Sequence, residues 1–97
     1  MRRFADERRN EVRLTEERLR HILRRHPEMA FQMHRFAETL AGPDAIRLSR
    51  SSPALQLYYR FHQDLRGRNR YVCLVVKRGR SDSFILTAYL DRKIKGD

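Results

Sequence analysis

Residues 55–62 read Leu-Gln-Leu-Tyr-Tyr-Arg-Phe-His, with an apolar or aromatic side chain at every odd position. Because successive side chains of a β-strand point to opposite faces of the sheet, this alternation predicts a strand with its odd residues against a core. Residues 71–77 form a β-branched run typical of a central strand, and residues 84–90 have the same character. With a short strand expected at 45–49, the second half of the chain predicts an antiparallel meander.

The first half of the chain has the period of helices instead. Thr15 is a candidate N-cap followed by acidic residues, and the apolar pattern behind it stops at Pro27. A second helix is expected over 28–41, where Gly42 and the proline after it end the pattern. Its inward residues are expected to be Met29, Met33, Phe36, Ala37 and Leu40.

Residues 1–13 mix charged and polar side chains with little periodicity, so we expect a flexible or short helical arm there. Residues 14–97 are then expected to form one domain. The predicted fold class is α+β, with N-terminal helices packed on one face of a four-stranded antiparallel sheet.

The composition points to a nucleic-acid partner. The 97 residues include 22 Lys and Arg against 12 Asp and Glu, a net charge of +10, and only three of the 22 are lysines. The planar guanidinium suits phosphate and stacked bases, so RNA is expected first and a small acidic protein second. No apolar run approaches the roughly 20 residues of a membrane-spanning helix.

The only cysteine, Cys73, sits in the middle of an apolar run. A single cysteine supplies neither a disulfide framework nor a zinc site, and we expect it to be buried. No metal or cofactor is expected, and the default location is a reducing cytoplasm.

A candidate site follows if Lys77 pairs with Phe84 and Phe61 pairs with Tyr71. The helices would cover the face that carries Leu57, Tyr59, Phe61, Cys73, Val75, Phe84, Leu86 and Ala88. The face turned to solvent would then carry Tyr58, Arg60, His62, Val72, Leu74, Val76, Ile85, Thr87 and Tyr89. The basic residues at one end of this sheet would be Arg66, Arg68, Arg70, Arg92, Lys93 and Lys95. Tyr58, His62 and these six residues are the predicted RNA-binding set.

This constellation is suited to RNA cleavage through the ribose 2′-OH, which needs proton transfer and cations for the developing phosphate charge. One of three histidines, His21, His26 or His62, could move protons near neutral pH. Arg60 could hold the phosphate, Thr87 could bond one of its oxygens, and Tyr58 and Tyr89 could stack a base. Each has an ordinary structural alternative. His26 before a proline is as readily a packed or capping residue, and Tyr58 and Thr87 are common in strands.

Several segments also resemble the phage-associated branch of the barnase–EndoU–colicin–RelE-like nuclease superfamily. The similar residues are the run from Leu14 through His-Ile-Leu-Arg-Arg-His-Pro-Glu28, then Leu57-Tyr-Tyr-Arg60, Tyr71–Lys77 and Phe84-Ile-Leu-Thr-Ala-Tyr-Leu90. The resemblance implies N-terminal helices on a four-stranded sheet and metal-independent RNA cleavage, often as a toxin or phage-borne effector. It would place the catalytic polar set on His21 or His26, Arg60, Thr87 and Tyr89.

The expected function is therefore a metal-independent ribonuclease-like domain, as the toxin of a toxin–antitoxin pair or a phage-derived effector. Two alternatives stay open. One is a module that binds RNA or DNA without cutting it. The other is an interaction protein whose arginine surface docks an acidic antitoxin or immunity protein.

Overall fold

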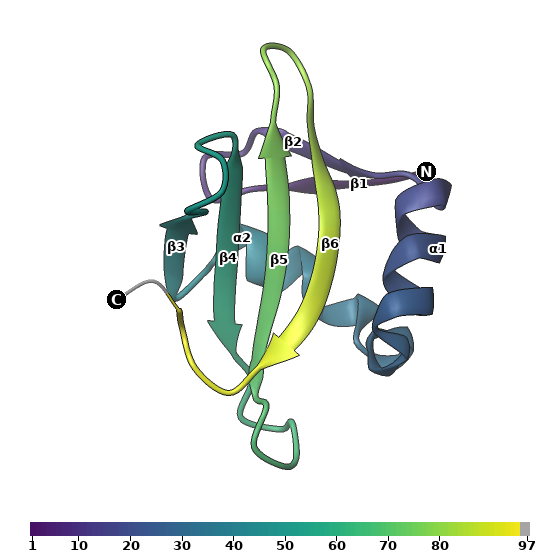
Figure 1. The fold of residues 1–97 in the computed structure, drawn as a ribbon, viewed down its shortest axis with the longest axis vertical. Coiled ribbons are helices and arrows are strands. Elements are labelled where there is room, and N and C mark those ends of the chain that lie inside the picture. Colours follow the sequence, from purple (N-terminus) through teal and green to yellow (C-terminus); the bar gives the residue numbers. More distant parts are fainter. Residues whose placement is uncertain (96–97) are drawn as a thin grey trace.

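The computed structural model describes residues 1–95, which form a six-stranded mixed sheet with two short α-helices (Figure 1). The sheet order is β1-β2-β6-β5-β4-β3, and all neighbours are antiparallel except β2 and β6. The strands are β1 (Arg2–Ala5), β2 (Glu11–Leu14), β3 (Ala45–Leu48), β4 (Leu55–Phe61), β5 (Tyr71–Arg78) and β6 (Ser83–Asp91). The expected four-stranded, all-antiparallel sheet is therefore wrong: β3–β6 form the predicted meander, but the N-terminal hairpin extends it.

Residues 1–13 contribute to that hairpin and are not an arm. The β1–β2 turn is held by Asp6, whose side chain accepts hydrogen bonds from the backbone N–H groups of Arg8 and Asn10, both at 2.9 Å. Val12 and Leu14 are fully buried. With only two apolar residues in alternation, β2 is too short for the sequence pattern to distinguish it from an irregular segment.

The two helices follow the hairpin. Helix α1 (Glu16–Arg25) begins at Thr15, whose hydroxyl accepts the Arg18 N–H at 3.1 Å, and it ends at His26 as predicted. The second predicted helix is broken into the 3-10 turns η1 (Pro27–Phe31) and η2 (Met33–Arg35) and the short α2 (Phe36–Ala41). Ala37, expected to face inward, is exposed because it lies on the outer side of this last turn. Neither helix of the described chain has the length and apolar character to cross a membrane.

The two predicted pairs are present, with Lys77 opposite Phe84 and Phe61 opposite Tyr71, but the register of β5 and β6 shifts between Val75 and Val76. The prediction of which face the helices cover is wrong. Helices α1 and α2 pack against the face of Tyr58, Val72, Leu74 and Val76, which share one core with Ile22, Phe36 and Leu40. Figure 1 shows α2 behind the sheet and α1 beside β6. Both faces of β5 are apolar, so alternation alone could not say which one the helices would cover.

A β-bulge in β6 separates residues that a regular strand would have kept together. Val75 lies opposite Thr87 and Val76 opposite Ile85, which leaves Leu86 as the extra residue. Beyond the bulge the alternation of β6 is inverted. Ala88 therefore joins the helix-covered core, while Thr87 and Tyr89 lie on the other face.

Candidate functional site

The sheet face turned away from α2 is aromatic and apolar. We call it the open face; its residues include Leu55, Leu57, Tyr59, Phe61, Tyr71, Cys73, Val75, Leu86, Thr87, Tyr89 and, after β6, Ile94. Tyr71 stands edge-on to two neighbours, with ring centroids 5.4 Å from Phe61 and 6.4 Å from Tyr59. Phe61 is 42% exposed and Tyr71 is half-buried, so part of this aromatic surface is accessible to a ligand.

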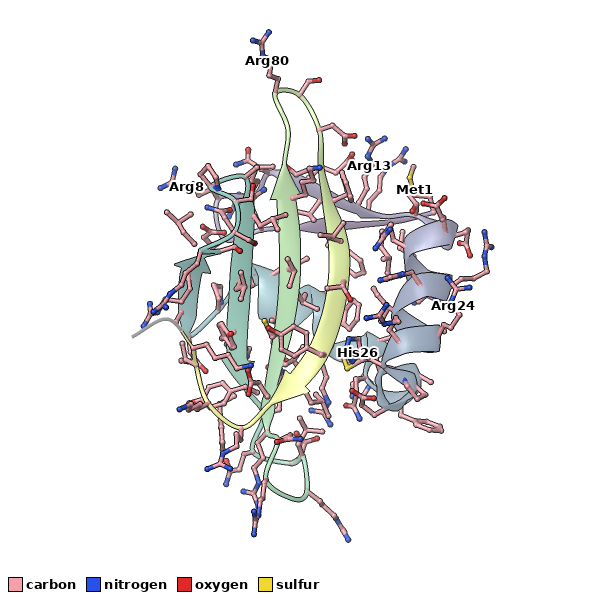
Figure 2. All side chains as sticks on the ribbon, in the orientation of Figure 1. Met1, Arg8, Arg13, Arg24, His26 and Arg80 are labelled. Atoms are coloured by element: carbon pink, nitrogen blue, oxygen red, sulfur yellow. The ribbon has the colours of Figure 1, made fainter. Side chains whose placement is uncertain are left out.

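His26 reaches the open face where α1 ends. Its ring lies against that of Tyr89 on β6, with 5.7 Å between centroids and an interplanar angle of 37°. The His26 Nδ1 atom is 3.8 Å from the Glu28 carboxylate, and the side chain is 35% exposed. On the same tyrosine, the Lys95 ammonium lies 6.0 Å from the ring centroid. Figure 2 shows His26 between the end of α1 and β6.

The Tyr89 hydroxyl is held in its protonated form. Burial raises its pKa far above the ordinary value, and the neighbouring Cys73 thiol and Tyr59 hydroxyl raise it further. Burial likewise raises the pKa of Cys73 to about 11. At neutral pH, Tyr89 is thus a neutral hydrogen-bond donor and Cys73 an unreactive thiol.

Arg18 supplies a cation where α1 contacts the bulge of β6, and the sequence did not reveal it. Its Nε donates to the carbonyl oxygen of Leu86, the bulged residue, at 3.0 Å. A bulged residue is not fully paired in the sheet ladder, so the guanidinium completes the bonding of this carbonyl. Because the bulge is set by pairing in the folded sheet, nothing in the local sequence around Arg18 marked it.

His21 lies one turn before the end of α1 and is half-buried. Partial burial lowers its pKa, and the positive charges of Arg18 and Arg25 lower it further. We define the α1–β6 seam as Arg18, His21, His26, Thr87 and Tyr89. Four of these five residues were predicted catalytic residues: His26 contacts Tyr89, Thr87 lies on the same face of β6 as Tyr89, and His21 lies on α1.

The fifth predicted catalytic residue, Arg60, lies elsewhere. It is opposite Val72 on the helix-covered face, where its Nε donates to Glu38 at 2.9 Å and its terminal nitrogen bonds the Gly42 carbonyl. Thr87 lies on the other face. The predicted grouping of Arg60 with Thr87 and Tyr89 is therefore wrong, because the bulge turns Thr87 and Tyr89 to the face opposite Arg60.

Two predicted RNA-binding residues are also buried under the helices. Tyr58 is 0% exposed, and its hydroxyl donates to Glu7 at 2.6 Å and accepts from Arg78 at 2.5 Å. His62 is 5% exposed, with Nε2 3.2 Å from the Thr39 hydroxyl. Neither side chain is available to stack a base, because each lies on the face that α2 covers.

The six predicted basic residues lie at one end of the sheet, the end that carries Tyr89. The loop between β4 and β5 carries Arg66, Arg68 and Arg70; Arg92, Lys93 and Lys95 follow β6; all six are exposed. Tyr71 opposite Asp91 brings the two segments together. Gly67, with a φ of +86°, turns the loop so that its carbonyl accepts the Arg70 Nε at 3.0 Å.

The opposite end of the sheet holds a polar cavity of about 600 Å³ between the β1–β2 turn and the β5–β6 hairpin. Its central charges bond one another: Arg78 donates to Asp6 at 3.0 Å and to Gln56 at 2.7 Å. Burial raises the pKa of Asp6, but hydrogen bonds from Asn10, Arg8 and Arg78 more than offset this and lower it overall. This network ties the hairpin to β4 and β5. In Figure 2, Arg8 and Arg80 point outward from this end.

Comparison of the chain with family models, curated proteins and solved structures finds no match. In the described chain no three His, Cys, Asp or Glu side chains converge as a metal site would require. The open face and the α1–β6 seam are therefore the features of the protein that bear on its function.

Proposed function

We propose that the protein binds RNA on its open face and cleaves it at the α1–β6 seam without a metal ion. The observation that carries this proposal is the contact between the rings of His26 and Tyr89, which joins a proton-transfer group to the edge of an aromatic surface. Imidazole accepts and donates protons near neutral pH, and aromatic faces stack unpaired bases.

The proposed reaction is attack of a ribose 2′-oxygen on the adjacent phosphorus, with cleavage of the bond to the 5′-oxygen. The proton of the 2′-OH passes to a base and the leaving oxygen receives one from an acid. The products are a 2′,3′-cyclic phosphate and a 5′-OH. His26 is the proposed proton carrier, and Tyr89, neutral at this pH, is the proposed donor to a phosphate oxygen.

Arg18 is the proposed cation of the seam. Only its Nε is bonded, to Leu86, so within residues 1–95 its terminal N–H groups have no protein partner and are free for phosphate oxygens. Thr87 follows Leu86 directly and lies on the same face as Tyr89. The basic end of the sheet would guide the RNA strand toward this seam.

RNA binding without cleavage is the second candidate. It is favoured by Arg60, since the arginine first expected to hold the phosphate is bonded to Glu38 and Gly42 on the other face. In a cell, the cleaving form would act as a toxin. An acidic antitoxin covering the basic end of the sheet would neutralise it.

The deciding experiment incubates the purified protein with a single-stranded RNA oligonucleotide in EDTA. The matched substrate is the same oligonucleotide with 2′-deoxyribose throughout. We expect 2′,3′-cyclic phosphate ends from RNA only, and a large loss of cleavage in Tyr89→Phe but not in the neighbouring Tyr71→Phe. Binding without cleavage would select the second candidate, and the absence of RNA binding at low salt would contradict both.

A further inference from the structure

The outward side of α1 carries two arginines, Arg20 and Arg24, that belong neither to the core nor to the seam. They stand one helical turn apart, about 6 Å along the axis. Both are exposed, and within residues 1–95 neither takes part in an ion pair. Figure 2 shows Arg24 pointing away from the sheet. We call this pair the outer arginines.

The helix dipole explains only one of these two arginines. Cations in the last turn interact favourably with the helix dipole, which accounts for Arg24 and its neighbour Arg25. Arg20 lies in the middle of the helix, where that effect has faded. The acids of α1 are in its first turn, and Glu16 there is 3.4 Å from the amino terminus. Among the described residues, Arg20 takes part in no ion pair that would hold its guanidinium.

The outer arginines differ chemically from the open face. The outward side of α1 carries only charged and imidazole side chains, whereas the open face has Tyr71, Phe61 and Tyr89. Aromatic rings stack on unpaired bases. A row of guanidinium groups binds phosphates, and its affinity does not depend on which bases are present. A duplex presents phosphates with its bases already stacked, so the outer arginines fit a base-paired segment.

The two surfaces lie on the two sides of α1: Figure 2 shows Arg24 on its outer side, and His26, which ends the helix and contacts Tyr89, on the side of β6. We propose that the RNA substrate is structured: an unpaired segment lies on the open face and the seam, and the phosphates of an adjoining duplex bind Arg20 and Arg24. This inference depends on the proposed RNA binding and names its substrate class.

The test compares three RNA probes: a stem–loop, its loop sequence as a free strand, and its stem as a blunt duplex. For the wild type we expect about 10-fold tighter binding of the stem–loop than of the free strand at low salt. The double variant Arg20→Gln/Arg24→Gln should lose this advantage, and its salt dependence should weaken by about one phosphate contact per arginine. Its affinity for the free strand should stay unchanged.

The matched control is Arg50→Gln/Arg80→Gln, which removes the same charge from exposed positions at the far end of the sheet. It should keep the stem–loop advantage. The variant Arg20→Lys/Arg24→Lys preserves charge and helix propensity and should keep most of the stem–loop advantage. It is the control for a folding defect in the glutamine variant. A wild type that binds the free strand as tightly as the stem–loop, or a glutamine variant with its advantage intact, would overturn this inference alone. Failure of the wild type to bind any RNA would overturn the proposed function.

Discussion

His26 and Tyr89, far apart in the sequence, lie ring against ring where the end of α1 meets β6, with 5.7 Å between their centroids. This contact places an imidazole and a protonated phenol at the edge of the open face, while Arg18, two turns earlier on α1, bonds the bulged Leu86 of the same strand. A proton carrier, a neutral donor and a guanidinium are the groups that the proposed attack of a ribose 2′-oxygen on phosphorus requires.

The first prediction concerns His26. Replacing His26 with alanine should lower RNA cleavage by roughly 100-fold or more, because general acid–base catalysis supplies about that factor. His34→Ala is the control, since His34 is exposed on η2 and lies outside the seam. Initial rates on the same RNA decide the matter. Equal cleavage rates for the two variants would show that His26 does not transfer the proton.

The second prediction concerns Arg60. Arg60→Ala should leave cleavage at the wild-type rate and lower the free energy of unfolding by about 1 kcal/mol, through loss of its bonds to Glu38 and Gly42. Urea unfolding and cleavage assays on one preparation measure both effects, with Arg50→Ala as the exposed control. If the Arg60→Ala protein were stable but inactive, Arg60 would be required for cleavage and would belong to the site.

The third prediction concerns pH and His62. Burial lowers the pKa of His62 below its ordinary value of 6.5, and the nearby charge of Arg35 lowers it further. The unfolded chain therefore binds this proton more readily than the folded one. The stabilisation by neutral His62 is complete above pH 6.5 and is lost as the pH falls toward the lowered folded-state pKa.

In urea unfolding of the wild type, the free energy of unfolding should accordingly decrease as the pH is lowered from 7.5 to 5. The variant His62→Gln should have a flatter profile, whereas His34→Gln should follow the wild type. Parallel profiles for the wild type and His62→Gln would show that another group causes the decline.

The fourth prediction concerns Cys73. It is fully buried in β5, and burial raises its pKa to about 11. A thiol reagent at neutral pH should therefore leave the folded protein unmodified for hours and label it within minutes in denaturant, because the thiolate is the reactive form. Rapid labelling without denaturant would mean that β5 readily exposes Cys73 to the reagent in the folded protein.

The fifth prediction concerns the basic end of the sheet. Replacing Arg66, Arg68 and Arg70 together with glutamine should weaken single-strand binding and reduce the slope of log K against log salt by about 2, at ~0.7 per phosphate lost. All three are exposed, so the thermal midpoint should hardly change. Titrations at several salt concentrations measure the slope; an unchanged slope would show that the strand does not pass this loop.

Much of the secondary structure followed from local patterns. The predicted strand at 55–62 corresponds to Leu55–Phe61, the one at 71–77 to Tyr71–Arg78, and the first helix to Glu16–Arg25. Even the pairing of Lys77 with Phe84 was predictable, because short connections hold neighbouring antiparallel strands in register. The exposure of the arginine loop and the burial of Cys73 also followed from local sequence.

The sequence by itself thus determined the helix start, the meander, the pairing of Lys77 with Phe84 and of Phe61 with Tyr71, and the basic end of the sheet, since each depends on neighbouring residues. Only the tertiary structure decided which face the helices cover. Val72 and Leu74 are as apolar as their odd-numbered neighbours, so the choice depends on where α1 and α2 pack. The bulge at Leu86 then decided that Thr87 and Tyr89 lie on the open face, where Tyr89 contacts His26, whereas Arg60 lies on the opposite face. That inversion depends on strand pairing across the sheet, which no local pattern in β6 encodes.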